Sequence, residues 1–124
     1  MVEFLKMNKK LNSNDLSKIS KLFKNKKIGL CHGSFDLVHL GHLNHFREAK
    51  KLVDILVISI TSEKFINKGE GRPFNSDYKR IEFLKYLKYI DYIYVENSTS
   101  AVNVIQKLKP NFYFKGIDYE EKDL

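Results

Sequence analysis

The chain has 124 residues and a formal net charge of +7, most of it from lysine. This length fits one domain with a modest core, and the positive charge permits an anionic ligand without identifying one. The one cysteine, Cys31, excludes a disulfide within the chain and a thiolate metal cluster, and its apolar neighbours predict a small core residue. Neither a signal-peptide pattern nor a membrane-spanning apolar run is present, which predicts a cytoplasmic protein without a membrane partner.

The first part of the chain, residues 1–26, is predicted to form an arm and a helix. Residues 1–10 are mixed and Lys-rich, which indicates a loose arm. The helix is expected to start with a cap at Ser13 or Asn14 and to run to about Lys24. Its predicted inward face consists of Leu16, Ile19, Ser20 and Phe23. Residues 27–124 are assigned to the main domain.

A strand, a turn and a helix follow between residues 28 and 52. The apolar run at 28–31 predicts the strand, Gly33 and Ser34 mark the turn, and the pattern becomes helical from about Gly41. The predicted buried face of this helix consists of Leu43, Phe46, Ala49 and Leu52. A strand that passes through a turn into a helix brings unpaired N–H groups and the positive end of the helix dipole to one point. The sequence therefore predicts a phosphate-binding site here.

Two histidines stand at the start of this helix. His39 and His42 are three residues apart, so their side chains share one face and both could reach one phosphate. The ordinary alternative is a pair of surface histidines. The preceding strand, together with Gly33, Asp36 and Gly41, favours the phosphate site, since Gly41 would let a ligand approach the backbone closely.

The rest of the chain alternates between strands and helices. Ser76 is the expected cap of the next helix, and a long apolar run at 54–61 indicates a strand buried on both faces. The predicted inward residues are Ile81, Leu84 and Leu87 in one helix and Val102, Ile105 and Leu108 in the next. The predicted elements are a strand at 54–61, a helical turn at 62–66, a loop at 67–73, a helix at 77–87, a strand at 89–95, a helix from Ser98 or Ser100 to Pro110, and a strand at 111–115.

This alternation predicts an α/β fold of the Rossmann-like type, a parallel sheet with right-handed crossovers and helices on both faces. In such sheets ligands bind beyond the carboxyl ends of the strands. Three loops should lie there, at residues 33–42, 68–73 and 115–119, and all three carry Lys, His, Asp or Gly. Their convergence predicts a nucleotide pocket.

Two short motifs resemble those of a known family. Residues 33–36 read Gly-Ser-Phe-Asp and residues 39–42 read His-Leu-Gly-His. Together they resemble the signature of the cytidylyltransferase-like nucleotidyltransferases, a Gly-[Ser/Thr/Cys]-Phe-Asp turn followed by His-x-Gly-His. Residues 68–73, Lys-Gly-Glu-Gly-Arg-Pro, are similar to the Lys-Gly-x-Gly-Arg-Pro loop of the heptose 1-phosphate adenylyltransferase branch. Residues 115–119 are similar to Lys-Gly-Gly-Asp-Tyr of the same branch, with Ile117 in place of the second glycine.

The resemblance, which covers roughly residues 14–120, implies an enzyme. A phosphate monoester would attack the α-phosphorus of a nucleoside triphosphate and release pyrophosphate. ATP and heptose 1-phosphate are the leading substrates, and CTP with glycerol 3-phosphate or a similar alcohol phosphate is the alternative. Mg²⁺ is the implied cofactor, because it screens a triphosphate while using few protein ligands. A homodimer is also implied.

The resemblance assigns roles to particular residues. The implied catalytic residues are His39, His42, Lys68 and Arg80. The implied nucleotide-binding residues are Gly33, Ser34, Phe35, Gly41, Arg72, Lys115, Gly116, Asp118 and Tyr119. Asp36 would bind acceptor hydroxyls or the Mg²⁺ shell, or else cap the turn, and no residue is predicted to bind the metal directly. The alternatives are an exposed charged loop for Lys68 and Arg72 and a surface helix position for Arg80.

One departure from the family affects the function. Its members continue to a further strand and a Gly-x-Ser-Thr-Thr-like segment that holds the triphosphate, whereas this sequence stops at Leu124. We therefore expect either a fragment of a longer protein, for example one with a fused kinase domain, or an incomplete phosphate site. A nucleotide-binding domain without turnover is the first rival function. A nucleic-acid-binding module is the second, but it needs a clustered basic face with stacking aromatics, so no nucleic-acid partner is expected.

Overall fold

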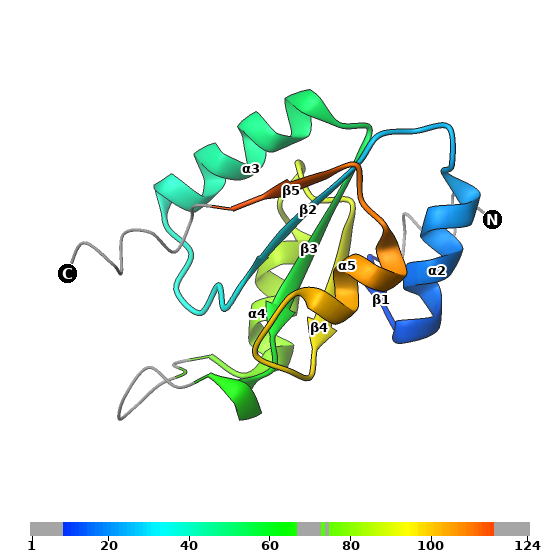
Figure 1. Cartoon of the computed structure of the whole chain (residues 1–124). Helices are drawn as coiled ribbons and strands as arrows, with labels where there is room; N and C mark the ends of the chain where they lie inside the picture. The colour runs from blue at the N-terminus through cyan, green and yellow to red at the C-terminus, as the bar shows by residue number, and fades with distance from the viewer. Residues whose placement is uncertain (1–8, 67–72, 74, 116–124) are drawn as a thin grey trace.

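The computed structural model describes residues 9–66, 73 and 75–115, and every structural statement below concerns these residues (Figure 1). In chain order, the elements are β1 (Lys10–Leu11), α2 (Ser13–Leu22), β2 (Ile28–Gly33), α3 (Leu40–Leu52), β3 (Ile55–Thr61), η1 (Glu63–Phe65), α4 (Asp77–Lys85), β4 (Tyr92–Glu96), α5 (Val102–Leu108) and β5 (Phe112–Phe114). None of these helices combines the length and hydrophobicity needed to cross a membrane.

All described strands belong to one parallel sheet with the order β1-β4-β3-β2-β5. Every residue of the central strand β3 is buried, as its continuous apolar run predicted. The predicted α/β Rossmann-like fold is therefore confirmed.

Two helices cover each face of the sheet. Phe46 of α3 and Ile81 of α4 belong to one buried cluster, and Leu16 of α2 and Val104 of α5 belong to the other. Figure 1 shows α4 and α5 on opposite sides of the sheet. The chain moves through β2, β3 and β4 with its helices on one face, then returns by α5 on the other face to β5. Crossovers of constant hand require this change of face. The strand order therefore reverses between β2 and β5, the position where sheets of this type bind ligands.

The start of the chain differs from the prediction. Lys10, expected in a loose arm, pairs with Ile93 and so begins a strand at the edge of the sheet. The cap of α2 is Asn12, one residue before the expected positions, and its side chain accepts a hydrogen bond from the N–H of Asp15 at 3.0 Å. The carboxylate of Asp15 in turn accepts from the N–H of Asn12, so the two residues form a capping box. β1 and α2 thus belong to the same sheet and core as the rest.

Two helices present a different face from the one expected. Val102, predicted to point inward, is 56% exposed, whereas Val104 and Leu108 are buried. The buried positions of α5 are thus four residues apart. The prediction assumed three-residue steps and therefore selected an adjacent face of the helix. In α3 the predicted Phe46 and Ala49 are buried, but Leu52 is exposed. His42 is buried on this helix as well.

Cys31 lies in β2 and is buried, as the sequence predicted. Burial raises the pKa of its thiol to about 12. The thiol therefore stays protonated at neutral pH and acts as a small core group rather than a nucleophile.

The packing of β2 against β5 generates a stability prediction. A Cβ added at Gly29 would lie 2.7 Å from Cε2 of Phe114 and 2.9 Å from Cγ1 of Val53. We expect Gly29→Ala to lower the free energy of unfolding by about 1–3 kcal/mol, because overpacking forces neighbouring side chains to move. Urea denaturation would measure the change, with Ser17→Ala at an exposed position of α2 as the control. Equal stability of the two variants would contradict the prediction.

Candidate functional site

The candidate site lies at the carboxyl end of the sheet, around the end of β2. The strands β3, β2 and β5, which lead into the three predicted loops, are neighbours in the sheet. The structure describes the first loop, at 33–42, and the exposed Lys115 that follows β5. The other predicted residues of the second and third loops lie outside the described residues; they are Lys68, Arg72, Gly116, Asp118 and Tyr119.

His39 and His42 together cap the N-terminus of α3. The Nδ1 atom of His39 accepts a hydrogen bond from the N–H of Gly41 at 3.0 Å. The Nδ1 atom of His42 accepts one from the N–H of His39 at 3.1 Å, and the ring centroids of the two histidines lie 4.1 Å apart. Because both Nδ1 atoms are acceptors, the proton of each neutral ring is on Nε2. The backbone thus orients two N–H donors beside the positive end of a helix, where anions bind.

Phe35 supports this pair from inside the protein. Its ring is 3% exposed and makes edge contacts with His42 and Phe46, with centroid distances of 5.7 and 5.4 Å. Its φ angle of 46° is in the left-handed region, which costs a non-glycine residue on the order of 1–3 kcal/mol. Packing of the ring offsets this strain. Phe35 therefore affects the site by holding the ring of His42 in place, which makes it a positioning residue.

The two glycines of the motifs make room for aromatic rings. A Cβ at Gly33 would lie 3.1 Å from Cζ of Phe35, and a Cβ at Gly41 would lie 2.7 Å from Cε1 of His39. The space beside Gly41, expected to admit a ligand, is occupied by the ring of His39. Glycine at this position is required by the histidine cap itself.

Arg80 is buried, with 2% of its surface exposed, so the alternative of a surface helix arginine is wrong. One terminal nitrogen donates to the carbonyl oxygens of Ser34 and Thr61 at 2.6 and 2.7 Å. The other donates to the carboxylate of Asp77 at 2.5 Å. Burial lowers the pKa of Arg80, and the neighbouring carboxylates oppose that shift. The guanidinium thus joins the ends of β2 and β3 to α4, while the predicted contact with phosphate stays a prediction.

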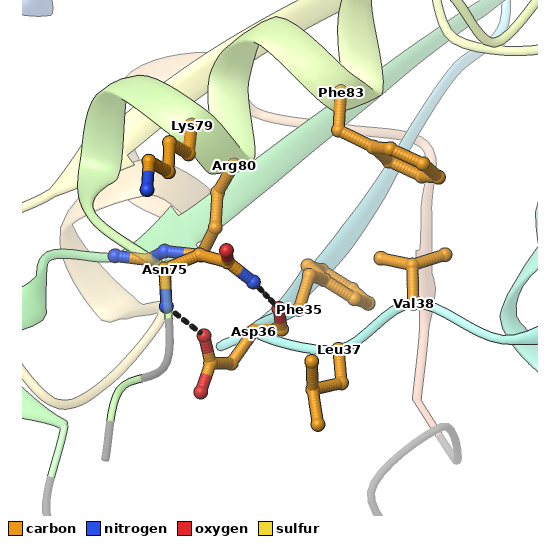
Figure 2. Close-up of a pocket in the computed structure, with 8 residues that line it drawn as sticks. All are labelled: Phe35, Asp36, Leu37, Val38, Asn75, Lys79, Arg80 and Phe83. Carbon is orange, nitrogen blue, oxygen red and sulfur yellow. Dashed lines mark hydrogen bonds between the residues drawn. The ribbon is translucent and has the colours of Figure 1, made fainter. Parts of the chain in front are cut away.

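Asp36 also connects the turn to α4. Its Oδ1 atom accepts a hydrogen bond from the backbone N–H of Asn75 at 2.8 Å. The side-chain amide of Asn75 donates to the carbonyl oxygen of Asp36 at 2.6 Å (Figure 2). Asn75 directly precedes Ser76, which caps α4 as predicted. These contacts favour the turn-holding alternative for Asp36. No motif marked Asn75, and only its position beside the predicted cap could have indicated it.

A cavity of about 290 Å³ lies between the turn and α4 (Figure 2). Polar groups of Asp36, Asn75, Lys79 and Arg80 line it together with apolar side chains. The apolar residues are Phe35, Leu37, Val38 and Phe83. The cavity adjoins the histidine cap through Phe35, which lines the cavity and contacts His42.

The described residues contain no group of three or more His, Cys, Asp or Glu side chains that could hold a metal ion. Asp36, the nearest predicted candidate, already uses one carboxylate oxygen for Asn75. A Mg²⁺ ion held mainly by protein side chains therefore does not fit this part of the chain. One that arrives on a triphosphate needs few protein ligands, and that arrangement fits.

Comparison with known proteins decides the family. A family model described as cytidylyltransferase-like matches residues 30–123. The chain belongs to the cytidylyltransferase-like family. The match includes the turn, the histidine cap and the sequence of all three predicted loops. It confirms the resemblance that the two motifs indicated.

Curated relatives support this assignment. The bifunctional protein HldE of Campylobacter jejuni subsp. doylei (strain ATCC BAA-1458 / RM4099 / 269.97) is 36% identical over 101 residues, which cover 80% of this chain and 22% of that protein. The protein of the same name from Helicobacter pylori (strain P12) is 35% identical over 111 residues, which cover 88% of this chain and 24% of that protein. The chain thus spans less than a quarter of the length of these relatives.

Solved structures show the same fold. A lipopolysaccharide core biosynthesis protein from Thermoplasma volcanium GSS1 superposes with a TM-score of 0.63 at 23% identity, covering 79% of this chain and 84% of that one. The pantoate-beta-alanine ligase from Francisella tularensis gives a TM-score of 0.59 at 20% identity, covering 90% of this chain and 57% of that one. At these identities the likeness concerns the fold alone.

The histidine cap predicts the effect of a methyl group at Gly41. Gly41→Ala should turn the ring of His39 away, because the added Cβ would lie 2.7 Å from Cε1. The imidazole ¹⁵N shifts of His39 should then change in long-range ¹H–¹⁵N NMR spectra. The free energy of unfolding should change little, because the roughly 1 kcal/mol by which alanine favours a helix over glycine offsets the loss of the His39 cap. Asn44→Ala, exposed on the same helix, is the control, and His39 shifts that stay the same in Gly41→Ala would overturn the steric argument.

The buried guanidinium predicts a large stability effect. Arg80→Ala removes the donor shared by Ser34 and Thr61 and leaves Asp77 without its ion-pair partner. We expect the free energy of unfolding to fall by about 2–3 kcal/mol, because two carbonyl oxygens lose a charged donor and an ion pair with a partly exposed carboxylate is broken. Chemical denaturation would measure the loss. Arg47→Ala, which removes an exposed arginine on α3, should change stability by no more than about 0.5 kcal/mol. Similar effects of both substitutions would contradict the role given to Arg80.

Proposed function

We propose that the chain transfers a nucleoside monophosphate from a nucleoside triphosphate to the phosphate of a sugar or polyol phosphate. The observation that carries this proposal is the histidine cap of α3, in which both Nδ1 atoms accept backbone hydrogen bonds. Membership of the cytidylyltransferase-like family supports the same reaction class. ATP and heptose 1-phosphate are the leading substrates.

The reaction needs charge stabilisation more than a strong base. The acceptor phosphate is already an anion, and one of its oxygens forms a bond to the α-phosphorus of the triphosphate. The bond from that phosphorus to the oxygen bridging the β-phosphate breaks, and pyrophosphate leaves with the electron pair. Two polyanions must therefore meet. The Nε2–H groups of His39 and His42 would donate to the triphosphate, and the dipole of α3 would add to their effect.

Preorganisation of the turn supports this role. Arg80 holds the carbonyl of Ser34, and Asn75 holds Asp36 at two atoms. Phe35 fixes the ring of His42 from the core side. Donors held before the substrate arrives need no reorganisation during the reaction. Mg²⁺ bound to the triphosphate would supply further charge neutralisation.

The other loops are proposed to complete the site. Lys68 and Arg72 would contact phosphates, as the resemblance of residues 68–73 to the heptose 1-phosphate adenylyltransferase branch implies. Lys115, Gly116, Asp118 and Tyr119 would lie beside the nucleotide. Position supports this, because β5 pairs with β2 and so brings Lys115 next to the strand that leads into the turn.

A second substrate pair is CTP with glycerol 3-phosphate or a similar alcohol phosphate, because the motif at residues 32–36 resembles both branches of the family. The loop at 68–73 favours ATP and heptose 1-phosphate.

Pyrophosphate release tests the proposal. ATP, CTP and GTP would each be combined with heptose 1-phosphate and with glycerol 3-phosphate in the presence of Mg²⁺. We expect release with one pair. His39→Ala should lower kcat by about 10²–10³-fold, because it removes one preorganised donor to the charged transition state. Asn44→Ala, on the exposed side of α3, should retain the rate.

Two results would reject parts of this proposal. Nucleotide binding without pyrophosphate release from any pair would reject the transfer reaction and leave a nucleotide-binding domain. Release that persists at the full rate in His39→Ala would reject the catalytic role of the histidine cap.

A further inference from the structure

A second polar cluster lies at the carboxyl end of the sheet, on the face covered by α2 and α5. It consists of His32, Ser59, Glu96 and Ser98. His32 pairs in register with Ser59, and Glu96 pairs in register with Thr61 at the end of the next strand. Side chains of alternate residues share a face, so His32 lies on the same face as the core residue Leu30, and Glu96 on that of Tyr94. The cluster therefore continues the α2/α5 core toward the ligand-binding end.

Glu96 is the unusual member of this cluster. It is 2% exposed, and one carboxylate oxygen accepts a hydrogen bond from the hydroxyl of Ser98 at 2.9 Å. The other oxygen, Oε1, is buried and has no hydrogen-bond partner within the described ranges. Buried polar atoms are almost always paired, because loss of their hydration is costly. An unfilled carboxylate acceptor at the ligand-binding end of a sheet indicates a ligand that brings its own donor.

The polar side chains recorded beside Glu96 are those of Ser98 and His32. His32 is half-buried, and its Nδ1 atom lies 2.6 Å from the hydroxyl of Ser59. Burial lowers the pKa of His32, while the carboxylate of Glu96 opposes that shift, so the ring is neutral and within electrostatic reach of Glu96. Neither Lys nor Arg forms an ion pair with Glu96 among the residues that the structure describes.

The charge of Glu96 selects the kind of group that can bind there. A carboxylate repels phosphate, so the phosphates belong at the histidine cap and a hydroxyl or amine donor belongs at Glu96. β4 is two strands from β2, a separation of about 10 Å at the usual strand spacing. A sugar or polyol phosphate has a phosphate at one end and hydroxyls along the rest of its length, which matches this division of charge.

We propose that Glu96 is a specificity residue that binds hydroxyl groups of the phosphorylated acceptor through its unpaired oxygen. This inference rests on the proposed function and adds the feature by which the acceptor is recognised. His32, held by Ser59, borders the same hydroxyl-binding position. The acceptor is thus bound at two points, through its phosphate beside α3 and through its hydroxyl groups at the end of β4.

Binding in the absence of nucleotide tests this inference. Isothermal titration would compare heptose 1-phosphate, glycerol 3-phosphate, inorganic phosphate and ATP with the wild-type chain and with Glu96→Gln. We expect at least one hydroxylated phosphate to bind wild type more tightly than inorganic phosphate does. Glu96→Gln should lower the affinity for that ligand by about 10-fold or more, because a charge-assisted hydrogen bond is lost. The affinities for inorganic phosphate and ATP should stay the same. Glu48→Gln, an exposed carboxylate on α3, is the matched control.

A thermal melt of the unliganded variant separates recognition from a structural role. Glu96→Gln should keep or raise the Tm, because it removes a buried charge with an unpaired oxygen. A large drop in Tm, or equal weakening of all ligands, would overturn the inference and assign Glu96 to the scaffold. If Glu96→Gln weakened only the binding of ATP, the hydroxyl bound by Glu96 would belong to the nucleotide, and the inference would be wrong. It would also be wrong if the wild-type chain showed no preference for hydroxylated phosphates over inorganic phosphate. Pyrophosphate release and His39→Ala judge the proposed function separately, since neither enters this binding experiment.

Discussion

The left-handed backbone of Phe35 is the constraint on which the site depends. That conformation turns the ring back over Gly33, where no Cβ obstructs it, and buries it against Phe46. His42 also makes an edge contact with this ring, and His39 packs on His42. A row of four rings therefore runs from the core to the surface. The orientation of the outermost histidine depends on each ring beneath it, so the geometry of the site is set by the core.

The carboxyl end of the sheet divides into two chemically different regions around this row. Nitrogen donors gather where β2 passes into α3, and Arg80 and Asn75 hold that turn from α4. Oxygen acceptors gather two strands away, where Glu96 is buried on the opposite face. A ligand with a phosphate and a hydroxylated body would meet both regions. The two regions would then bind the phosphate and the hydroxyl groups of one ligand separately.

The sequence predicted most of the fold because its signals are local. The buried strand β3, the cap at Ser76 and the shared face of His39 and His42 depend on residues close together in the chain, and the structure confirms each of these local features. The error at the start of the chain depends on a distant contact, because Lys10 is a strand residue only where β4 lies beside it. The hydrogen bonds of Arg80 and Asp36, which no sequence pattern specified, likewise come from partners brought together by the crossover to α4. No sequence pattern predicted the unpaired oxygen of Glu96, because it results from the lack of a hydrogen-bond donor beside it in the folded structure.

The pairing of β1 has a consequence for how the chain reaches this structure. β1 is made before its partner strand, because Ile93 follows Lys10 by 83 residues (93 − 10). The emerging chain can pair β2 with β3 first, because only α3 separates them. Contacts between distant residues close slowly, since they carry a larger loop-closure entropy. β1 can therefore pair only after β4 has formed, and its edge position lets it join the sheet without displacing a strand already in place.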